Sequence, residues 1–233
     1  MTLLHCFLRH PQTAILCAKG NFKSAYHCTT LHGDIAAKCI ITNDKLAFIR
    51  LWLAFGGKLY PAEWCVSSKL TTDLANDILP APQWSLVELA SPHAAMMPIL
   101  WPSSEPFINT LPLDVFIPAD DMGCIGDFFG DVITIVLHAG DNWRRGSGAS
   151  LLVIPTAYQP MDAAEPLPWD DVLSLLKLKD EGKMWEDIIV LGCRINTRSF
   201  DIGLLIDKFK AWMGDIASIT KSKWATYQVL NTL

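Results

Sequence analysis

The sequence has no long hydrophobic run and few charged residues. Its longest largely apolar stretch, residues 46–55, is interrupted by Arg50, and the apolar run at 132–137 is only six residues long. A membrane-spanning helix needs about 18 or more consecutive apolar residues, so we expect no transmembrane segment and no membrane partner. The first residues also lack the basic and apolar segments of a signal peptide. We therefore expect an intracellular protein, in the cytoplasm or nucleus, whose seven cysteines are reduced thiols.

Charged residues make up 18% and apolar residues 51% of the 233 residues. This composition is the reverse of that of a disordered chain, and it predicts one globular domain or two small ones. The net charge of −5 hides an asymmetry, because residues 1–60 carry +5, residues 61–142 carry −10 and residues 143–233 are neutral. The acidic total argues against nucleic acid as a partner, whereas the basic first sixty residues favour a local binding surface.

Apolar periodicity and turn residues predict a mixture of strands and helices. Expected strands lie at 13–18, 132–137, 188–191 and 199–204, the last two as a hairpin; expected helices lie at 67–79, 169–179 and 206–219. The first helix has Leu70, Leu74 and Ile78 at apolar spacing, and the last has Ile206, Phe209, Met213 and Ile216 on one face. Because no regular βα repeat is present, the expected fold class is α+β.

Glycine and proline mark the expected interruptions. Gly20-Asn21 predicts a break after the first strand, and residues 126–131 predict a hairpin turn before the strand at 132–137. Gly-Ser-Gly at 146–148 predicts a loop before a helix-like segment at 149–154. Residues 36–55 give mixed helix and strand signals, and the proline-rich residues 80–123 predict a long loop or insertion.

Four short blocks follow one another along the chain: Asn21-Phe-Lys-Ser-Ala-Tyr26, Phe55-Gly-Gly-Lys-Leu-Tyr-Pro61, Phe128-Phe-Gly-Asp131, and Val190-Leu-Gly192 followed by Asp207-Lys208. In this order they resemble the palm of a eukaryotic retrotransposon reverse transcriptase, an RNA-directed DNA polymerase. The resemblance implies a palm-like antiparallel sheet packed on helices over residues 15–215, with the proline-rich segment as an insertion. It also implies a remnant of the fingers at 1–20 and the start of a thumb or connection at 205–233.

The resemblance further implies two-metal nucleotidyl transfer. In the family, an Asp opens the first block and an Asp-Asp pair ends the third; these carboxylates hold two Mg²⁺ or Mn²⁺ ions that activate the primer 3′ oxygen and steady the pyrophosphate. Here the first position is Asn21 and the first member of the pair is Gly130, so Asp131 remains as the catalytic carboxylate and metal ligand. Because two counter-charges are missing, we expect polymerase activity to be reduced ~10³-fold or more.

Other site residues follow from the same resemblance. Tyr26 would lie under the sugar of the incoming nucleotide, Phe55 and Gly56 would lie against the nucleotide, and Leu191 and Gly192 would belong to the primer grip. The implied partners are an RNA or DNA primer–template and deoxynucleotides. Tyr26 as a core aromatic residue is the structural alternative.

Several alternatives stay open. Asp131 could be an ordinary strand-edge carboxylate, and Asp127, on the same strand face by the two-residue period, is a candidate to compensate for the lost ligands. If the palm interpretation holds, Asn21 and Asp131 must lie side by side on adjacent antiparallel strands. The first alternative function is a non-catalytic remnant that binds nucleic acid or protein through residues 1–60.

A lesser alternative is a zinc-binding domain. Histidine and cysteine, the usual zinc ligands, recur in two sets offset by 22 residues, namely His5, Cys6, His10 and Cys17, then His27, Cys28, His32 and Cys39. The spacing lacks the tight Cys-x₂₋₄-Cys hook of structural zinc sites, so buried thiols and surface histidines are the competing interpretation.

Overall fold

The computed structural model describes residues 2–53, 60–81, 122–128, 130–158 and 172–222. Within these ranges the chain forms six α-helices, a short 3₁₀ helix and eight strands in three small antiparallel sheets, so the expected α+β class is confirmed. In chain order the elements are α1 (Thr2–Arg9), β1 (Ile15–Asn21), η1 (Ala25–Cys28), α2 (Gly33–Lys38), β2 (Ile41–Asn43), β3 (Leu46–Phe48), α3 (Tyr60–Ile78), β4 (Gly123–Phe128), β5 (Asp131–Leu137), α4 (Asn142–Ala157), α5 (Leu175–Glu181), β6 (Asp187–Val190), β7 (Cys193–Asn196), β8 (Asp201–Leu204) and α6 (Ile206–Ser222). Most of the predicted proline-rich insertion, residues 82–121, lies outside the described residues.

The central sheet has the strand order β1-β5-β4, and both neighbouring pairs are antiparallel. β4 and β5 form the hairpin that the sequence predicts, and β1 pairs with β5 as far as Asn21 opposite Asp131. The predicted break at Gly20-Asn21 is therefore wrong. The strand continues because β5 offers backbone hydrogen-bonding partners along this whole length.

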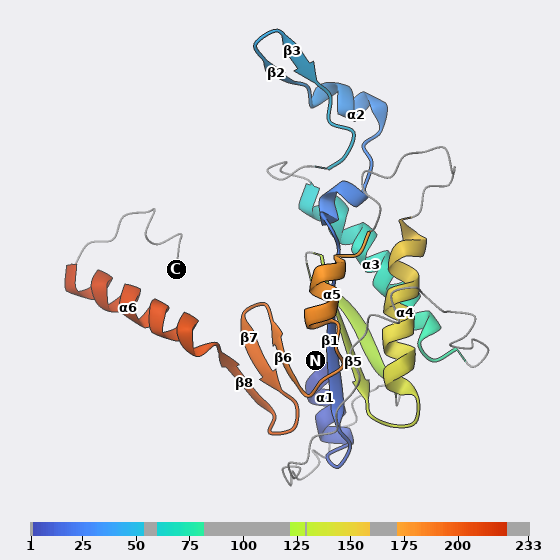
Figure 1. Ribbon diagram of the computed structural model, residues 1–233, viewed down its shortest axis with the longest axis vertical. Helices are drawn as coiled ribbons and strands as arrows, with labels where there is room; N and C mark the ends of the chain where they lie inside the picture. Colours follow the sequence, from blue (N-terminus) through green and yellow to red (C-terminus); the bar gives the residue numbers. More distant parts are fainter. Residues whose placement is uncertain (1, 54–59, 82–121, 129, 159–171, 223–233) are drawn as a thin grey trace.

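Helices α3 and α4 pack together on one face of the central sheet (Figure 1). Their buried side chains, including Trp64 from α3 and Ile154 from α4, form the main hydrophobic core with Val132 of β5. The other face of the sheet is thereby left to carry the polar residues at the ends of β1 and β5.

The predicted helix at 67–79 is present as α3, but a different stripe of it is buried. Leu70 and Leu74 are 71% and 41% exposed, whereas Ser68, Thr71 and Thr72 are buried. The hydroxyl of Thr71 donates to the Ser67 carbonyl at 3.0 Å, so its polar atom is satisfied inside the helix. Small side chains with satisfied hydroxyls let the helix approach the sheet closely, and apolar spacing alone could not identify this stripe.

The predicted loop at 146–148 is wrong, because these residues lie inside helix α4. A Cβ at Gly146 would be 2.7 Å from Val136 Cγ1 and 2.9 Å from Thr134 Cγ2, both on β5. The glycine is needed for close helix-to-sheet contact, which outweighs its low helix propensity.

The second large sheet is a meander with the order β6-β7-β8. The predicted hairpin of 188–191 with 199–204 is wrong, because β7 lies between these two strands. Ile188 and Val190 pack on Cys17 of β1, and a backbone bridge joins Cys17 to Trp185. This contact places the meander over part of the open face of the central sheet.

The helix predicted at 169–179 corresponds to the shorter α5. The residues just before α5 are extended, since the Lys23 amide donates to the Val172 carbonyl at 2.7 Å and the Ser174 amide to the Asn21 carbonyl at 2.9 Å. These bonds use backbone groups that a longer helix would need. They also hold α5 beside the end of β1.

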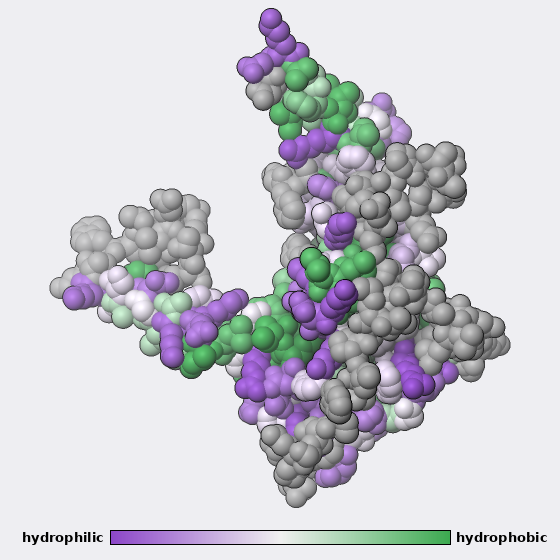
Figure 2. Space-filling view, in the orientation of Figure 1, coloured by the Kyte–Doolittle hydropathy of each residue, from purple (hydrophilic) through white to green (hydrophobic). Residues whose placement is uncertain are grey.

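Two arms project from this body (Figure 1). One arm carries α2 and the β2–β3 hairpin, so the segment with mixed helix and strand signals at 36–55 contains both kinds of element. The other arm carries α6, which confirms the predicted helix at 206–219. Hydrophobic residues gather on the first arm and where the second arm leaves the body (Figure 2). None of the helices in the described ranges is long and apolar enough to cross a membrane.

Candidate functional site

The two predicted site residues Asn21 and Asp131 lie directly opposite each other on β1 and β5. Paired residues of an antiparallel sheet point to the same face, and Phe128 of β4 is the next residue across. This is the side-by-side placement that the palm interpretation requires. Val132, the neighbour of Asp131, belongs to the core under α3 and α4, so the pair occupies the opposite face of the sheet.

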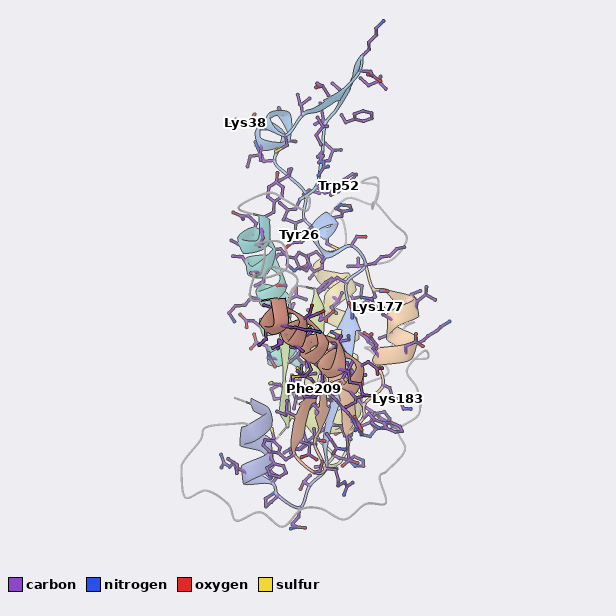
Figure 3. All side chains as sticks on the ribbon, turned by 90° about the vertical axis from the view of Figure 1, so that its left-hand side faces the viewer. Tyr26, Lys38, Trp52, Lys177, Lys183 and Phe209 are labelled. Carbon is purple, nitrogen blue, oxygen red and sulfur yellow. The ribbon has the colours of Figure 1, made fainter. Side chains whose placement is uncertain are left out.

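Three further charged side chains converge on this pair. Lys177 Nζ donates to Asn21 Oδ1 at 2.8 Å, and Asn21 Nδ2 donates to Glu181 Oε2 at 3.2 Å. Lys19 Nζ lies 2.7 Å from Glu181 Oε2 and 3.9 Å from Asp131 Oδ2. We call these five residues the Asn21 cluster. Helix α5 contributes Lys177 (labelled in Figure 3) and Glu181, which lie one helical turn apart.

The charges within the Asn21 cluster balance. Two ammonium groups, from Lys19 and Lys177, face two carboxylates, from Asp131 and Glu181. Asn21 is only 4% exposed, and both atoms of its amide are satisfied by charged partners. Hydrogen bonds to charged groups are stronger than neutral ones, so the cluster holds α5 against the end of β1.

The Asn21 cluster does not fit a pair of divalent cations. Lysine ammonium groups donate hydrogen bonds and have no acceptor atom that could bind a metal. The ammonium groups of Lys19 and Lys177 already supply the positive charge that balances the carboxylates of Asp131 and Glu181. Within the ranges that the structure describes, no group of three or more His, Cys, Asp or Glu side chains could hold a metal ion. These side chains therefore lack the set of free oxygen ligands that two Mg²⁺ or Mn²⁺ ions need.

Gly130 has a structural reason to be glycine. Its φ is +101°, a conformation that residues with a Cβ rarely adopt, and a Cβ there would be 2.9 Å from Ala25 Cβ. Its carbonyl accepts from the Phe22 amide at 2.9 Å, which ties the hairpin turn to the residue after β1. An Asp at this position would be strained in the backbone conformation that the chain adopts.

Asp127 does not share a face with Asp131, so the predicted strand period is wrong here. Asp127 lies on β4, opposite Val132, because the chain turns between the two carboxylates. Its carboxylate accepts from the Ser68 hydroxyl at 2.5 Å and from the Thr72 hydroxyl at 3.5 Å, both on α3. It therefore satisfies the buried hydroxyls of the helix, on the face of the sheet opposite to that of Asp131.

Tyr26 lies in the core of the protein. It is buried in η1, and its ring meets that of Trp64 edge-on at 6.2 Å. Phe22 meets the same indole at 5.0 Å. Phe55 and Gly56, the other predicted nucleotide contacts, lie outside the described residues.

Leu191 and Gly192 form the two-residue turn between β6 and β7. Both have positive φ, 51° and 81°, the conformation that closes tight antiparallel hairpins. The side chain of Lys208 in α6 lies against Gly192, so that a Cβ at position 192 would meet it. The predicted primer-grip residues thus lie in a turn of the second sheet that contacts the α6 arm.

The two His/Cys sets do not form a metal site among the described residues. Cys6 packs in an apolar cluster with Phe7 and Ile15, and Cys39 Sγ lies 3.0 Å from the Tyr60 hydroxyl. Burial raises the pKa of the Cys17 thiol to about 12, with smaller contributions from Cys6 and Cys124, and burial also raises the pKa of Cys28 to about 12. Zinc binds the thiolate, so these two buried thiols are poor ligands at neutral pH.

Sequence reasoning missed Lys19, Lys177 and Glu181. Lys19 could have been found, because it is two residues from Asn21 on the same strand and therefore on the same face. Nothing in the local sequence indicates that α5 docks there, since its placement depends on the backbone pairing of residues 172–174. Comparison of the chain with protein-family models, curated proteins and solved structures finds no match.

Proposed function

We propose that this chain is a reverse-transcriptase-like palm that no longer catalyses nucleotidyl transfer. The observation that carries the proposal is the Asn21 cluster. Asn21 and Asp131 are paired across antiparallel strands as the motif resemblance requires, while Lys19 and Lys177 supply the positive charge. Two ammonium groups balance the remaining carboxylates, so these carboxylates need no metal ion as a counter-charge. Without metal ions the site also lacks the means to activate a primer hydroxyl.

The test is primer extension on an RNA template with millimolar Mg²⁺ or Mn²⁺. We expect the wild-type chain to incorporate deoxynucleotides at the background rate, at least ~10³-fold below a working polymerase. The double variant Asn21→Asp, Gly130→Asp should also stay inactive, because both lysines remain and position 130 demands a positive φ.

Incorporation by the wild-type chain that needs metal and is lost in Asp131→Asn would contradict this proposal. Thermal unfolding of each variant controls for loss of the fold. Incorporation that survives in Asp131→Asn would indicate a contaminating polymerase, and a preparation free of it decides the question.

A second candidate function is binding of nucleic acid without catalysis. Lys38, Lys45 and Arg50 are exposed on the α2–β2–β3 arm, and Trp52 follows them. Figure 3 shows Lys38 and Trp52 on this arm, well above Lys177 and Lys183 on the body. Cations with interspersed aromatic rings are the usual surface for phosphates and unstacked bases.

Binding to a labelled primer–template, measured by fluorescence anisotropy over a salt series, tests this candidate. Lys38→Glu with Lys45→Glu should weaken binding and lower the slope of log K against log salt by about two, one per lost phosphate contact. Lys69→Glu is the matched control, because Lys69 is an exposed lysine on α3 that pairs with Asp73. Equal effects of the two changes, or binding that ignores salt, would count against the arm as the binding surface.

A further inference from the structure

Strand β4 lies at an edge of the central sheet, because the strand order is β1-β5-β4. On the outer side of an edge strand, the backbone N–H and C=O groups of every second residue have no neighbouring strand to pair with. Such groups invite a strand of another molecule to add to the sheet. In the middle of β4 they belong to Ile125, which is only 3% exposed, so these buried groups need partners inside the fold.

The side chain of Asn76 in α3 supplies both partners. Asn76 Nδ2 donates to the Ile125 carbonyl at 2.6 Å, and the Ile125 amide donates to Asn76 Oδ1 at 2.7 Å. A side-chain amide carries the same kinds of donor and acceptor as a peptide group, so this two-point contact repeats the exchange of bonds between opposite residues of antiparallel strands. Asn76 Nδ2 also donates to the Thr72 carbonyl at 2.9 Å, which fixes the orientation of the amide on the helix.

Two further side chains on the same stripe of α3 reach β4. Ser68, Thr72 and Asn76 are four residues apart and therefore lie along one side of the helix. The hydroxyls of Ser68 and Thr72 donate to the Asp127 carboxylate at 2.5 and 3.5 Å. Helix α3 thus runs along β4 with a row of polar side chains turned toward the strand, and Asn76 is the member of this row that binds the backbone.

We propose that Asn76 takes the place of a neighbouring strand at the edge of β4, and that it closes the central sheet to β4 of a second copy of this chain. The opposite edge of the sheet is closed by backbone, since Cys17 of β1 forms a bridge with Trp185. At β4 the neighbour is a helix, which uses its own backbone groups internally. A side chain of α3 must then pair with Ile125, and an amide both donates and accepts.

Amide hydrogen exchange of the full chain tests the pairing. Asn76→Ala removes both bonds and keeps a good helix-forming residue. We expect the Ile125 amide to exchange at least ~10-fold faster relative to the amides of β5, because a buried donor loses its acceptor. Thr71→Ala is the matched control, since the buried hydroxyl of Thr71 on the same helix bonds Ser67 and Tyr158 instead of β4. In this control, exchange at Ile125 and in β5 should change by the same factor.

Thioflavin T fluorescence tests the protection against strand addition, at urea concentrations that give every variant the same unfolded fraction. Asn76→Ala should form β-rich aggregates at least ~5-fold faster than Thr71→Ala, because local opening of α3 now exposes an unpaired edge. Asn76→Asp should aggregate no faster than Thr71→Ala, since a charge at an edge opposes strand pairing.

Equal relative exchange of the Ile125 amide in the two alanine variants overturns the pairing by Asn76. Aggregation of Asn76→Ala at the rate of Thr71→Ala or of Asn76→Asp overturns the closure of the sheet edge. None of these outcomes depends on the proposed lack of polymerase activity.

Discussion

Replacing Gly123 with alanine is expected to destabilise the native fold strongly. Gly123 opens β4 with a φ of +141°, and a Cβ there would collide with the Ile135 carbonyl oxygen and lie 2.6 Å from Val136 Cα. Both neighbours are backbone atoms of β5, the central strand of the main sheet, so they cannot move aside without breaking the pairing of β4 with β5. We expect a loss of about 3 kcal/mol or more in the free energy of unfolding.

Urea denaturation followed by circular dichroism measures this loss. Gly126→Ala is the matched control, because it makes the same chemical change in the same strand and a Cβ there meets nothing within 4 Å. It should change the free energy of unfolding by no more than about 1 kcal/mol in either direction. Equal midpoints for the two variants would contradict the register of β4 against β5.

The double variant Lys19→Gln, Asn21→Asp is expected to convert a metal-indifferent protein into one stabilised by divalent cations. The changes remove one ammonium group and add a carboxylate 3.2 Å from Glu181 Oε2 and opposite Asp131. Three carboxylates would then face the single ammonium of Lys177. In the presence of EDTA this charge imbalance should lower the melting temperature, because close like charges in a half-buried site repel one another.

Differential scanning fluorimetry with EDTA or with Mg²⁺ measures the effect. A cation at ten times its dissociation constant adds about 1.4 kcal/mol, which for a chain of this size raises the melting temperature by roughly 3–5 °C. The wild-type chain should melt at the same temperature in both conditions. Adding Asp131→Asn to the double variant should abolish the shift, since it removes one of the ligands.

A magnesium-dependent melting temperature in the wild-type chain would contradict the charge balance of the Asn21 cluster. A double variant that is folded but indifferent to metal would show that Lys177 alone is enough to exclude the cation. Lys177→Gln in the same background then distinguishes this case, because it removes the last ammonium group from the cluster.

Local sequence signals predicted the elements whose neighbours are close in the chain. The β4–β5 hairpin follows from Gly126 to Asp131 and the apolar run after it, and α6 follows from its three-four spacing. The placement of Asn21 opposite Asp131 also agrees with the sequence, since the order of the motif blocks required it.

Predictions that depended on which face is covered were less successful. The apolar spacing of Leu70 and Leu74 indicated the wrong side of α3, because close contact with the sheet selects small side chains such as Ser68. Gly146 indicated a loop in the sequence, but it lies inside α4. Its missing Cβ allows close contact between the helix and the sheet.

The sequence by itself determined the scarcity of charge and long apolar runs, the α+β mixture, and the uncharged residues Asn21 and Gly130 beside Asp131. Only the tertiary structure decided which charged groups surround Asn21. Lys177 and Glu181 are more than 150 residues from Asn21 in the chain and reach it because the segment before α5 pairs with the end of β1. A buried amide needs partners and a half-buried carboxylate needs counter-charge. Long-range packing brings Lys177 and Glu181 to the Asn21 amide, and Lys19 of the same strand supplies positive charge to Glu181 and Asp131.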